Sequence, residues 1–189
     1  CEPYHYMSEF YADFADYTVE LTLPERFRDH CVTTGTLKEI IRPSHIDDKK
    51  VVYSSKAEDV HDFAFTVDAE ALLLRRTFDA KDYRDVAEEM KISAALGKNP
   101  EEVLPKSCEM ILLLQPEHAE YANRYFDATA KSLYYFGLWY GTYPYETISI
   151  VDPANNARQT GGMEYPRLFT GGARLGMADR TLSPQGVTV

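Results

Sequence analysis

The sequence lacks long apolar segments and runs of basic residues. Its longest uninterrupted apolar run covers residues 110–114, whereas a membrane-spanning helix needs about 20 apolar residues. Lysines and arginines form no run longer than a pair, and 30 acidic against 20 basic residues give a net charge of −10. The short apolar run leads us to expect no transmembrane segment. We also expect no nucleic-acid partner, because neutralisation of phosphates by basic residues supplies most non-specific affinity for nucleic acid.

The sequence also lacks closely spaced cysteines and a signal-peptide pattern. Cys1, Cys31 and Cys108 include no CxxC pair, and an odd number of cysteines does not make a closed disulfide framework. The cysteines therefore do not identify the cellular compartment of the protein, and the sequence shows no targeting segment that would identify it. Since the chain begins with Cys1 and not with methionine, we expect it to be part of a longer protein, whose oligomeric state the sequence does not set.

What the sequence does contain is enough apolar material for a core. Hydrophobic residues make up 44% of the 189 residues, which fits one large domain or two modest ones. Residues 17–23 alternate between apolar and polar side chains and end at Pro24, a pattern that predicts a half-buried strand. Further extended runs cover residues 32–41, 50–55 and 60–67. We therefore predict antiparallel β-structure for about the first 58 residues.

The following residues mix strands with helices. We predict a strand over residues 71–77, and a helix that has Asp79 as its N-cap and ends at Gly97. The predicted inner face of this helix contains Tyr83, Val86, Ala87, Met90 and Ala94. Residues 108–114 have the apolar character of a strand that is buried on both faces.

The clearest predicted element is a long helix between Pro116 and Gly141. Proline in the first turn and acidic residues near the positive end of the helix dipole favour this start, and glycine favours this end. A helix of this length must lie across a sheet. Helical spacing assigns its inner face to Ala119, Ala122, Phe126, Leu133, Phe136 and Tyr140. We also expect core packing for the aromatic cluster around its end, which comprises Tyr134, Tyr135, Trp139, Tyr140, Tyr143 and Tyr145.

Two more strands are predicted, over residues 147–151 and 163–170. Pro166 confines the second strand to a sheet edge. Gly161 and Gly162 precede it, and their missing Cβ atoms would let an extended peptide approach and pair as an additional strand. Glu164 beside them would be a counter-ion for the ammonium group of a peptide N-terminus. A Gly-Gly turn followed by an edge strand with a solvated glutamate explains the same residues without any function.

The run Gly161-Gly162-Met163-Glu164-Tyr165 resembles the exopeptidase motif, GxMEN, of the aminopeptidase-N-like zinc peptidases, which are gluzincins. The likeness includes the preceding turn Pro144-Tyr145-Glu146 and the strand over residues 148–152. His61-Asp62-Phe63-Ala64-Phe65 is similar to the strand that opens the catalytic domain of this family, and residues 112–141 are similar to the strand and long helix ahead of the motif. Position 165 departs from the pattern, with tyrosine in place of asparagine.

The resemblance implies an α+β fold of two parts. Residues 1–58 would be the C-terminal part of an antiparallel β-saddle domain, and residues 59–189 the N-terminal part of a thermolysin-like catalytic domain. The implied activity is hydrolysis of the N-terminal peptide bond of peptides. Glu164 would bind the α-ammonium group, Gly161 and Gly162 would present backbone groups to the substrate, and Met163 would border the pocket for its first side chain.

The resemblance also implies a Zn²⁺ ion, which this family holds on an HExxH helix with a further glutamate downstream. This sequence has no HExxH motif, and its five histidines are dispersed. In the family the motif follows a few tens of residues after the exopeptidase glutamate, and here only residues 165–189 follow Glu164. We therefore expect this chain to end before the zinc motif, to bind no metal itself and to be inactive alone. The alternative is a non-catalytic relative that acts as a peptide-binding or assembly module.

Overall fold

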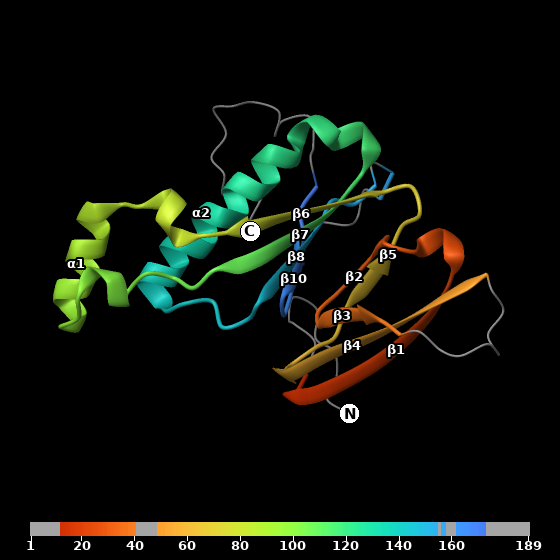
Figure 1. Cartoon of the computed structure of the whole chain (residues 1–189), viewed down its shortest axis with the longest axis horizontal. Coiled ribbons are helices and arrows are strands. Elements are labelled where there is room, and N and C mark those ends of the chain that lie inside the picture. Colours follow the sequence, from red (N-terminus) through yellow and green to blue (C-terminus); the bar gives the residue numbers. More distant parts are fainter. Residues whose placement is uncertain (1–11, 41–48, 155, 158–161, 173–189) are drawn as a thin grey trace, which may run out of the picture.

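The computed structural model describes residues 12–40, 49–154, 156–157 and 162–172. These residues form a mixed α+β fold with antiparallel strand pairs and two α-helices, as Figure 1 shows. The predicted α+β class is confirmed at this level. Within the described part of the chain, neither helix has the length and apolar character needed to cross a bilayer.

The N-terminal residues form two small antiparallel sheets. In the first, β4 (Lys50–Val60) lies between β1 (Ala15–Pro24) and β3 (Thr36–Glu39). In the second, β2 (Cys31–Thr33) pairs with β5 (Phe65–Val67). The single strand predicted over residues 32–41 is therefore wrong. The extended strand is interrupted around Gly35. A Cβ atom at this position would lie 2.4 Å from the carbonyl oxygen of Lys56, so only glycine permits this close approach of the two backbones.

The remaining strands form one five-stranded mixed sheet. Its order is β6 (Leu72–Phe78), β7 (Cys108–Leu114), β8 (Thr147–Val151), β10 (Leu168–Thr170) and β9 (Met163–Tyr165). The three central strands, β7, β8 and β10, are parallel, and each outer strand is antiparallel to its neighbour. The carboxyl ends of β7, β8 and β10 therefore meet at one end of the sheet.

The long predicted helix consists of two helical segments in the structure. A 3-10 segment (Pro116–Tyr121) leads directly into α2 (Ala122–Tyr140), and Gly141 follows as the C-cap. The expected position across a sheet is correct, because α2 runs along one face of the five-stranded sheet (Figure 1). The small N-terminal sheets lie on the side of the opposite face.

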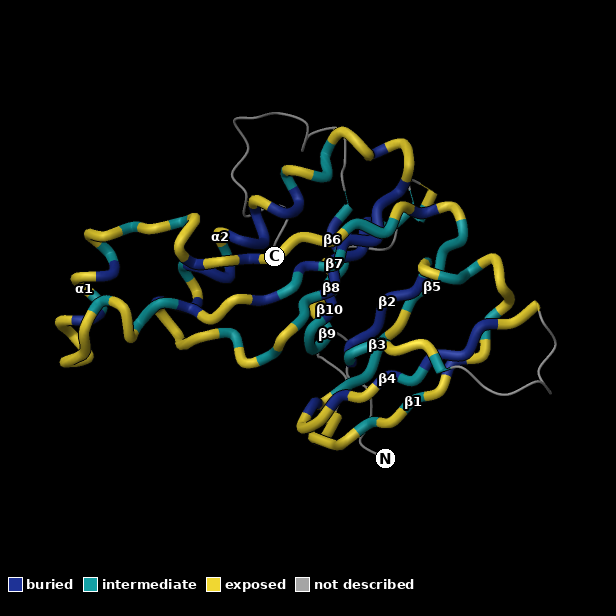
Figure 2. Tube along the Cα trace, viewed as in Figure 1, coloured by how far each residue is buried: buried dark blue, intermediate teal, exposed yellow. Residues whose placement is uncertain are grey.

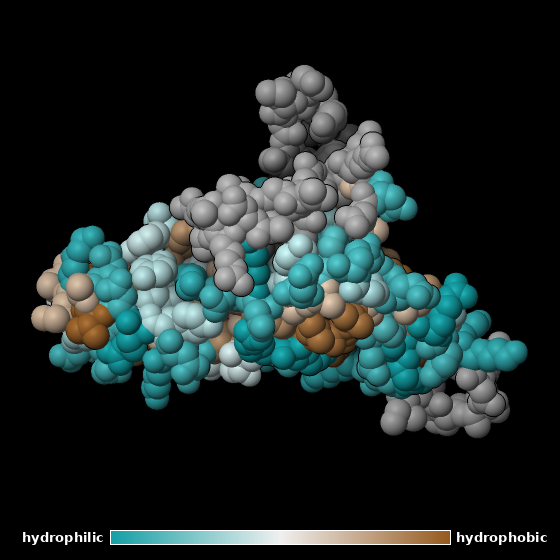
Figure 3. Space-filling model, turned by 90° about the horizontal axis from the view of Figure 1, so that it is seen from above, coloured by the Kyte–Doolittle hydropathy of each residue, from teal (hydrophilic) through white to brown (hydrophobic). Residues whose placement is uncertain are grey.

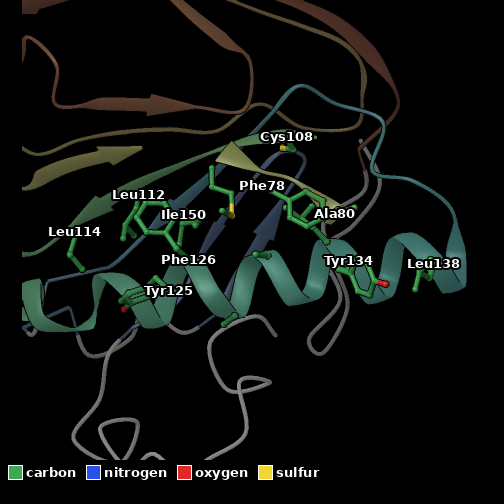
Figure 4. Close-up of a cluster of buried hydrophobic side chains, with 14 residues drawn as sticks. Phe78, Ala80, Cys108, Leu112, Leu114, Tyr125, Phe126, Tyr134, Leu138 and Ile150 are labelled. Carbon is green, nitrogen blue, oxygen red and sulfur yellow. The ribbon is translucent and has the colours of Figure 1, made fainter. Parts of the chain in front are cut away.

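Strand β7 contributes to a core on each of its faces. Its even-numbered residues, among them Met110 and Leu112, pack in the cluster below α2, while Leu113 packs in a second cluster with Val32 of β2. Figure 4 shows Leu112, Ile150 and Phe126 between the sheet and α2. The prediction of a strand buried on both faces is therefore confirmed. In Figure 2 the buried trace follows β7, β8 and the inner side of α2.

The predicted inner face of α2 is only partly correct. Phe126 and Leu133 are buried, but Phe136 and Tyr140 are 51% and 82% exposed, and Trp139 is also exposed. The inward side near the helix end is instead formed by Tyr134, Gly137 and Leu138. Because successive helical residues rotate by about 100°, this arrangement turns Phe136 to the solvent.

The helix predicted after Asp79 is also displaced. Asp79 caps a short 3-10 segment (Ala80–Tyr83), and α1 (Val86–Leu96) has Asp85 as its own N-cap. The expected inner residues Val86 and Met90 are 58% and 59% exposed. Glu89 lies inward instead, because Arg84 and Tyr134 supply hydrogen bonds to its carboxylate. On the face drawn in Figure 3, the exposed hydrophobic groups at the α1 end form a small patch on a largely hydrophilic surface.

Candidate functional site at the edge of the sheet

Strands β9 and β10 form a hairpin at the end of the five-stranded sheet. The single strand predicted over residues 163–170 is therefore wrong: Pro166 and Arg167 form the turn between two strands. Proline has no N–H group for a strand ladder, and Arg167 has a φ angle of 63°, which turns the chain back. The predicted edge position is correct for β9, which is the outermost strand.

Glu164 lies in the middle of β9 and is exposed. Its cross-strand partner is Phe169, which packs against the cluster below α2. Since directly opposed residues share a sheet face, Glu164 lies on the face that α2 covers. Its side chain forms no ion pair or side-chain hydrogen bond with any of the described residues.

The other predicted site residues surround Glu164 in different ways. Met163 is half-buried, and its N–H donates to the Thr170 hydroxyl at 3.0 Å. Gly162 is exposed immediately before the strand. Gly161 lies outside the described residues. The outer backbone edge of β9 has no strand partner among the described residues. A strand edge of this kind can pair with an additional strand.

A cavity of about 590 Å³ lies on the opposite face of the sheet. Tyr165, Leu168 and Thr170 form one of its walls, and residues 63–68 form another. Glu164 is not part of the lining, because alternate residues of a strand point to opposite faces. The cavity and the exposed carboxylate of Glu164 are therefore separate features of the same hairpin.

A buried polar cluster joins the carboxyl ends of the three parallel strands. Asp152 follows β8 and is 1% exposed. Its carboxylate lies 2.6 Å from Nδ1 of His118, 3.1 Å from the N–H of Gln115 and 2.7 Å from the Tyr125 hydroxyl. The same hydroxyl is 2.8 Å from the carbonyl oxygen of Gly171, which follows β10. These contacts satisfy buried polar groups and fix the strand ends relative to α2.

The side chain of Gln115 extends this cluster toward the cavity. Its Nε2 donates to the Asp68 carboxylate at 2.9 Å. This hydrogen bond, with one from the N–H of Glu70, lowers the pKa of Asp68 from its ordinary value. This role of Asp152 was not predicted from the sequence. The available signal was an acid placed directly after a buried strand, where the ends of parallel strands converge.

The described residues do not provide a zinc site. No group of three or more histidine, cysteine, aspartate or glutamate side chains in the described ranges has a geometry that could hold a metal ion. His118 is buried, and its Nδ1 atom contacts the carboxylate of Asp152. His30 contacts the carbonyl oxygen of Ala71 at 2.8 Å. The residues described here therefore do not fit a zinc ion.

Comparison of the chain with protein-family models finds no match, and comparison with curated proteins finds no similar sequence.

Proposed function

We propose that this chain is part of a zinc-dependent aminopeptidase, which hydrolyses the N-terminal peptide bond of peptides. In this proposal Glu164 of the GGMEY motif binds the α-ammonium group of the substrate. The observation that supports it best is the position of Glu164 on an outermost strand, exposed and without an ion-pair partner among the described residues. A carboxylate in this state is available to a cationic ligand.

The outer edge of β9, which has no strand partner within the described ranges, supports the second element of the proposal, which is main-chain recognition. An extended peptide that pairs with β9 would satisfy the unpaired N–H and C=O groups of the edge. Gly162 precedes the strand and has no side chain to obstruct the incoming backbone. The carboxylate of Glu164 would then fix the peptide end, so that cleavage is restricted to the first bond.

The catalytic groups of such an enzyme would lie outside the residues described here. A bound zinc ion would supply an activated water for hydrolysis. Because no described cluster fits zinc and the sequence has no HExxH motif, we assign to this chain only the binding and orientation of the peptide. The 189-residue chain alone is proposed to be inactive.

The binding part of the proposal can be tested on the chain alone. A short peptide with a free N-terminus and the same peptide with an acetylated N-terminus are titrated against the ¹⁵N-labelled chain, and amide shifts of residues 162–165 are followed by NMR. The free peptide is expected to bind at least about five-fold more tightly, since acetylation removes the charge that Glu164 recognises. Glu164→Gln should abolish this difference, and Glu70→Gln, another exposed glutamate, should leave it unchanged. Equal binding of the two peptides would falsify the assignment.

A non-catalytic peptide-binding or assembly module is the second candidate, because pairing at a free strand edge needs no metal. The two candidates differ in the encoded residues beyond Val189. An HExxH motif there, with peptidase activity of the longer protein, supports the enzyme. Peptide binding by a longer protein that lacks this motif supports the module.

A further inference from the structure

A second cavity, of about 730 Å³, lies between the N-terminal sheet and the five-stranded sheet. Strands β3 and β4 form one wall, and the segment before β8 together with the turn of the β9–β10 hairpin forms the other. The cavity is distinct from the edge of β9. Its lining includes Arg167, the residue of the hairpin turn that has a positive φ angle.

The guanidinium group of Arg167 is held in place by neutral partners. Its Nη2 donates to the hydroxyl of Thr36 at 3.0 Å and to the hydroxyl of Thr147 at 2.6 Å. The group lies 5.0 Å from the centre of the Tyr145 ring, at a distance typical of a cation–π contact. Within the described part of the chain it has no carboxylate partner.

One donor of this guanidinium group has no hydrogen-bond acceptor among the described residues. This donor is the Nε atom of Arg167, which is buried. Buried donors without an acceptor are rare and costly, and each one requires an explanation. A planar guanidinium whose neutral partners fix its orientation is suited to binding the oxygens of a carboxylate or a phosphate.

The backbone of Arg167 also points to a role for this side chain. A positive φ angle is uncommon for a residue that is neither glycine nor asparagine. The conformation is maintained because the N–H of Ser149 donates to the carbonyl oxygen of Arg167 at 2.8 Å. Strained backbone conformations concentrate at functional positions, and this one directs the side chain across to β3.

Two lysines of the N-terminal sheet add positive charge on the wall that faces Arg167. Lys56 is directly opposite Thr36 in the register of β3 and β4, and Lys38 is opposite Ser54. Both lysines line the cavity and are exposed. Thr36, Lys38 and Lys56 lie on one face of the sheet, because Thr36 and Lys56 are opposed and Lys38 is two residues beyond Thr36. Thr36 is also a hydrogen-bond partner of Arg167.

Three carboxylates also line the cavity, and they limit the charge of a ligand. Glu58 is two residues beyond Lys56 on β4, about 7 Å along the strand, and Asp59 follows it. Glu146 lies next to Tyr145 on the opposite wall. With three cations and three carboxylates, the cavity has no formal net charge, so binding of an anion depends on the local positions of Arg167 and Lys56 and not on the total charge of the lining.

The geometry points to an oxyanion-binding site in this cavity, in which Arg167 binds a carboxylate or phosphate group with support from Lys56. The site is independent of the proposed peptidase function, since it involves neither Glu164 nor the edge of β9. It explains why a cation that lines the cavity is fixed by threonine hydroxyls and stacked on an aromatic ring.

The test is an NMR titration of the ¹⁵N-labelled chain with sodium acetate and, separately, sodium phosphate, at constant ionic strength. Saturable shifts of the Arg167 Nε–H signal and of the amides of Thr36 and Lys56 are expected with at least one of the two anions. Arg167→Gln should raise the dissociation constant about ten-fold or more, because a charge-assisted hydrogen bond is lost. Lys56→Gln, at an exposed position, should raise it by about two- to three-fold.

Two matched controls separate the site from general charge effects. Arg75→Gln removes an exposed arginine that pairs with Glu109, and Lys131→Gln removes an exposed lysine that pairs with Asp127. Both controls should leave the dissociation constant unchanged. The proposal is overturned if neither anion gives saturable shifts, or if the control variants weaken binding as much as Arg167→Gln and Lys56→Gln do. Lys56→Gln keeps the test decisive even if Arg167→Gln does not fold.

Discussion

The carboxylate of Asp152 and the imidazole of His118 are 2.6 Å apart in the protein interior. The two side chains are 0% and 8% exposed. Asp152 follows β8, and His118 lies within the 3-10 segment before α2, so their contact joins one end of the sheet to the helical segment. A buried, hydrogen-bonded carboxylate adds little net stability in general, but its loss leaves the buried donors around it without an acceptor.

We therefore expect Asp152→Asn to lower the free energy of unfolding by about 2–4 kcal/mol, because the buried donors around Asp152 lose a charged acceptor. Urea unfolding followed by circular dichroism measures this change. Asp127→Asn serves as the control, since Asp127 is exposed and pairs only with Lys131 at the surface. A similar effect of both substitutions would show that the buried cluster has no special role.

A catalytic prediction concerns Glu164 in the longer, zinc-loaded protein. Glu164→Ala is expected to reduce kcat/KM on an aminoacyl-arylamide by about 30-fold or more, because the α-ammonium group loses its charged partner. Hydrolysis of an N-blocked substrate should not decrease. Unchanged kcat/KM on the free-amine substrate would remove Glu164 from the site.

A pH prediction follows from Glu89, which is fully buried. Hydrogen bonds from Arg84, followed by one from Tyr134, lower the pKa of Glu89 from its ordinary value of 4.5. A carboxylate with a lowered pKa in the folded state contributes stability above its ordinary pKa, and this contribution is lost as the pH falls toward the folded-state pKa. The difference in free energy of unfolding between the wild type and Glu89→Gln should therefore shrink between about pH 5 and pH 3.

Urea unfolding of both proteins at several pH values provides the measurement. At pH 7 we expect Glu89→Gln to cost about 1–3 kcal/mol, because charge-assisted hydrogen bonds become neutral ones. Glu58→Gln, an exposed position on β4, is the matched control and should show no such pH-dependent difference. A constant difference across this pH range would contradict the role of Glu89.

A packing prediction concerns Gly137 in the interior of α2. Alanine normally stabilises a helix interior relative to glycine by about 1 kcal/mol. Here the added Cβ atom would lie 2.4 Å from Cγ of Pro105, so Gly137→Ala should instead destabilise the protein by about 1–3 kcal/mol. Thermal unfolding tests the sign. Pro105 Cβ would also lie only 2.8 Å from the added atom, so in a Pro105→Gly background, which removes both atoms, Gly137→Ala should no longer destabilise the protein. A more stable single variant would refute the close contact.

The elements that the sequence predicted well are those with a strong local pattern. Strand β7 is apolar at nearly every position, and its predicted bounds are correct. The glycine after α2 correctly predicted the end of that helix, but not the 3-10 segment at its start. The orientation of α1 could not be obtained in this way. Its inward face contains Glu89, and the hydrogen bonds that make this possible come from Arg84 and from Tyr134 on α2, a distant part of the chain.

In the candidate site, too, the sequence predicted features with a local pattern and missed features that depend on long-range contacts. The Gly-Gly pair and Pro166 predicted an exposed edge around Glu164, and the outermost position of β9 agrees with that. The hairpin was missed because a single turn residue, Arg167, adopts a positive φ angle that arginine rarely shows. The clusters around Asp152 and Arg167 depend on contacts between residues far apart in sequence, which no local spacing reveals.

The packing of Val32 affects how the chain can be divided. This β2 residue shares a hydrophobic cluster with Leu113 and Val151 of the five-stranded sheet, and the expected boundary after residue 58 falls within β4, which continues to Val60. A cut at that boundary would expose buried apolar surface on both fragments and would divide strand β4. Fragments made by this cut should therefore aggregate when they are expressed separately. A protease should cleave the folded chain first at sites away from the residues around position 58.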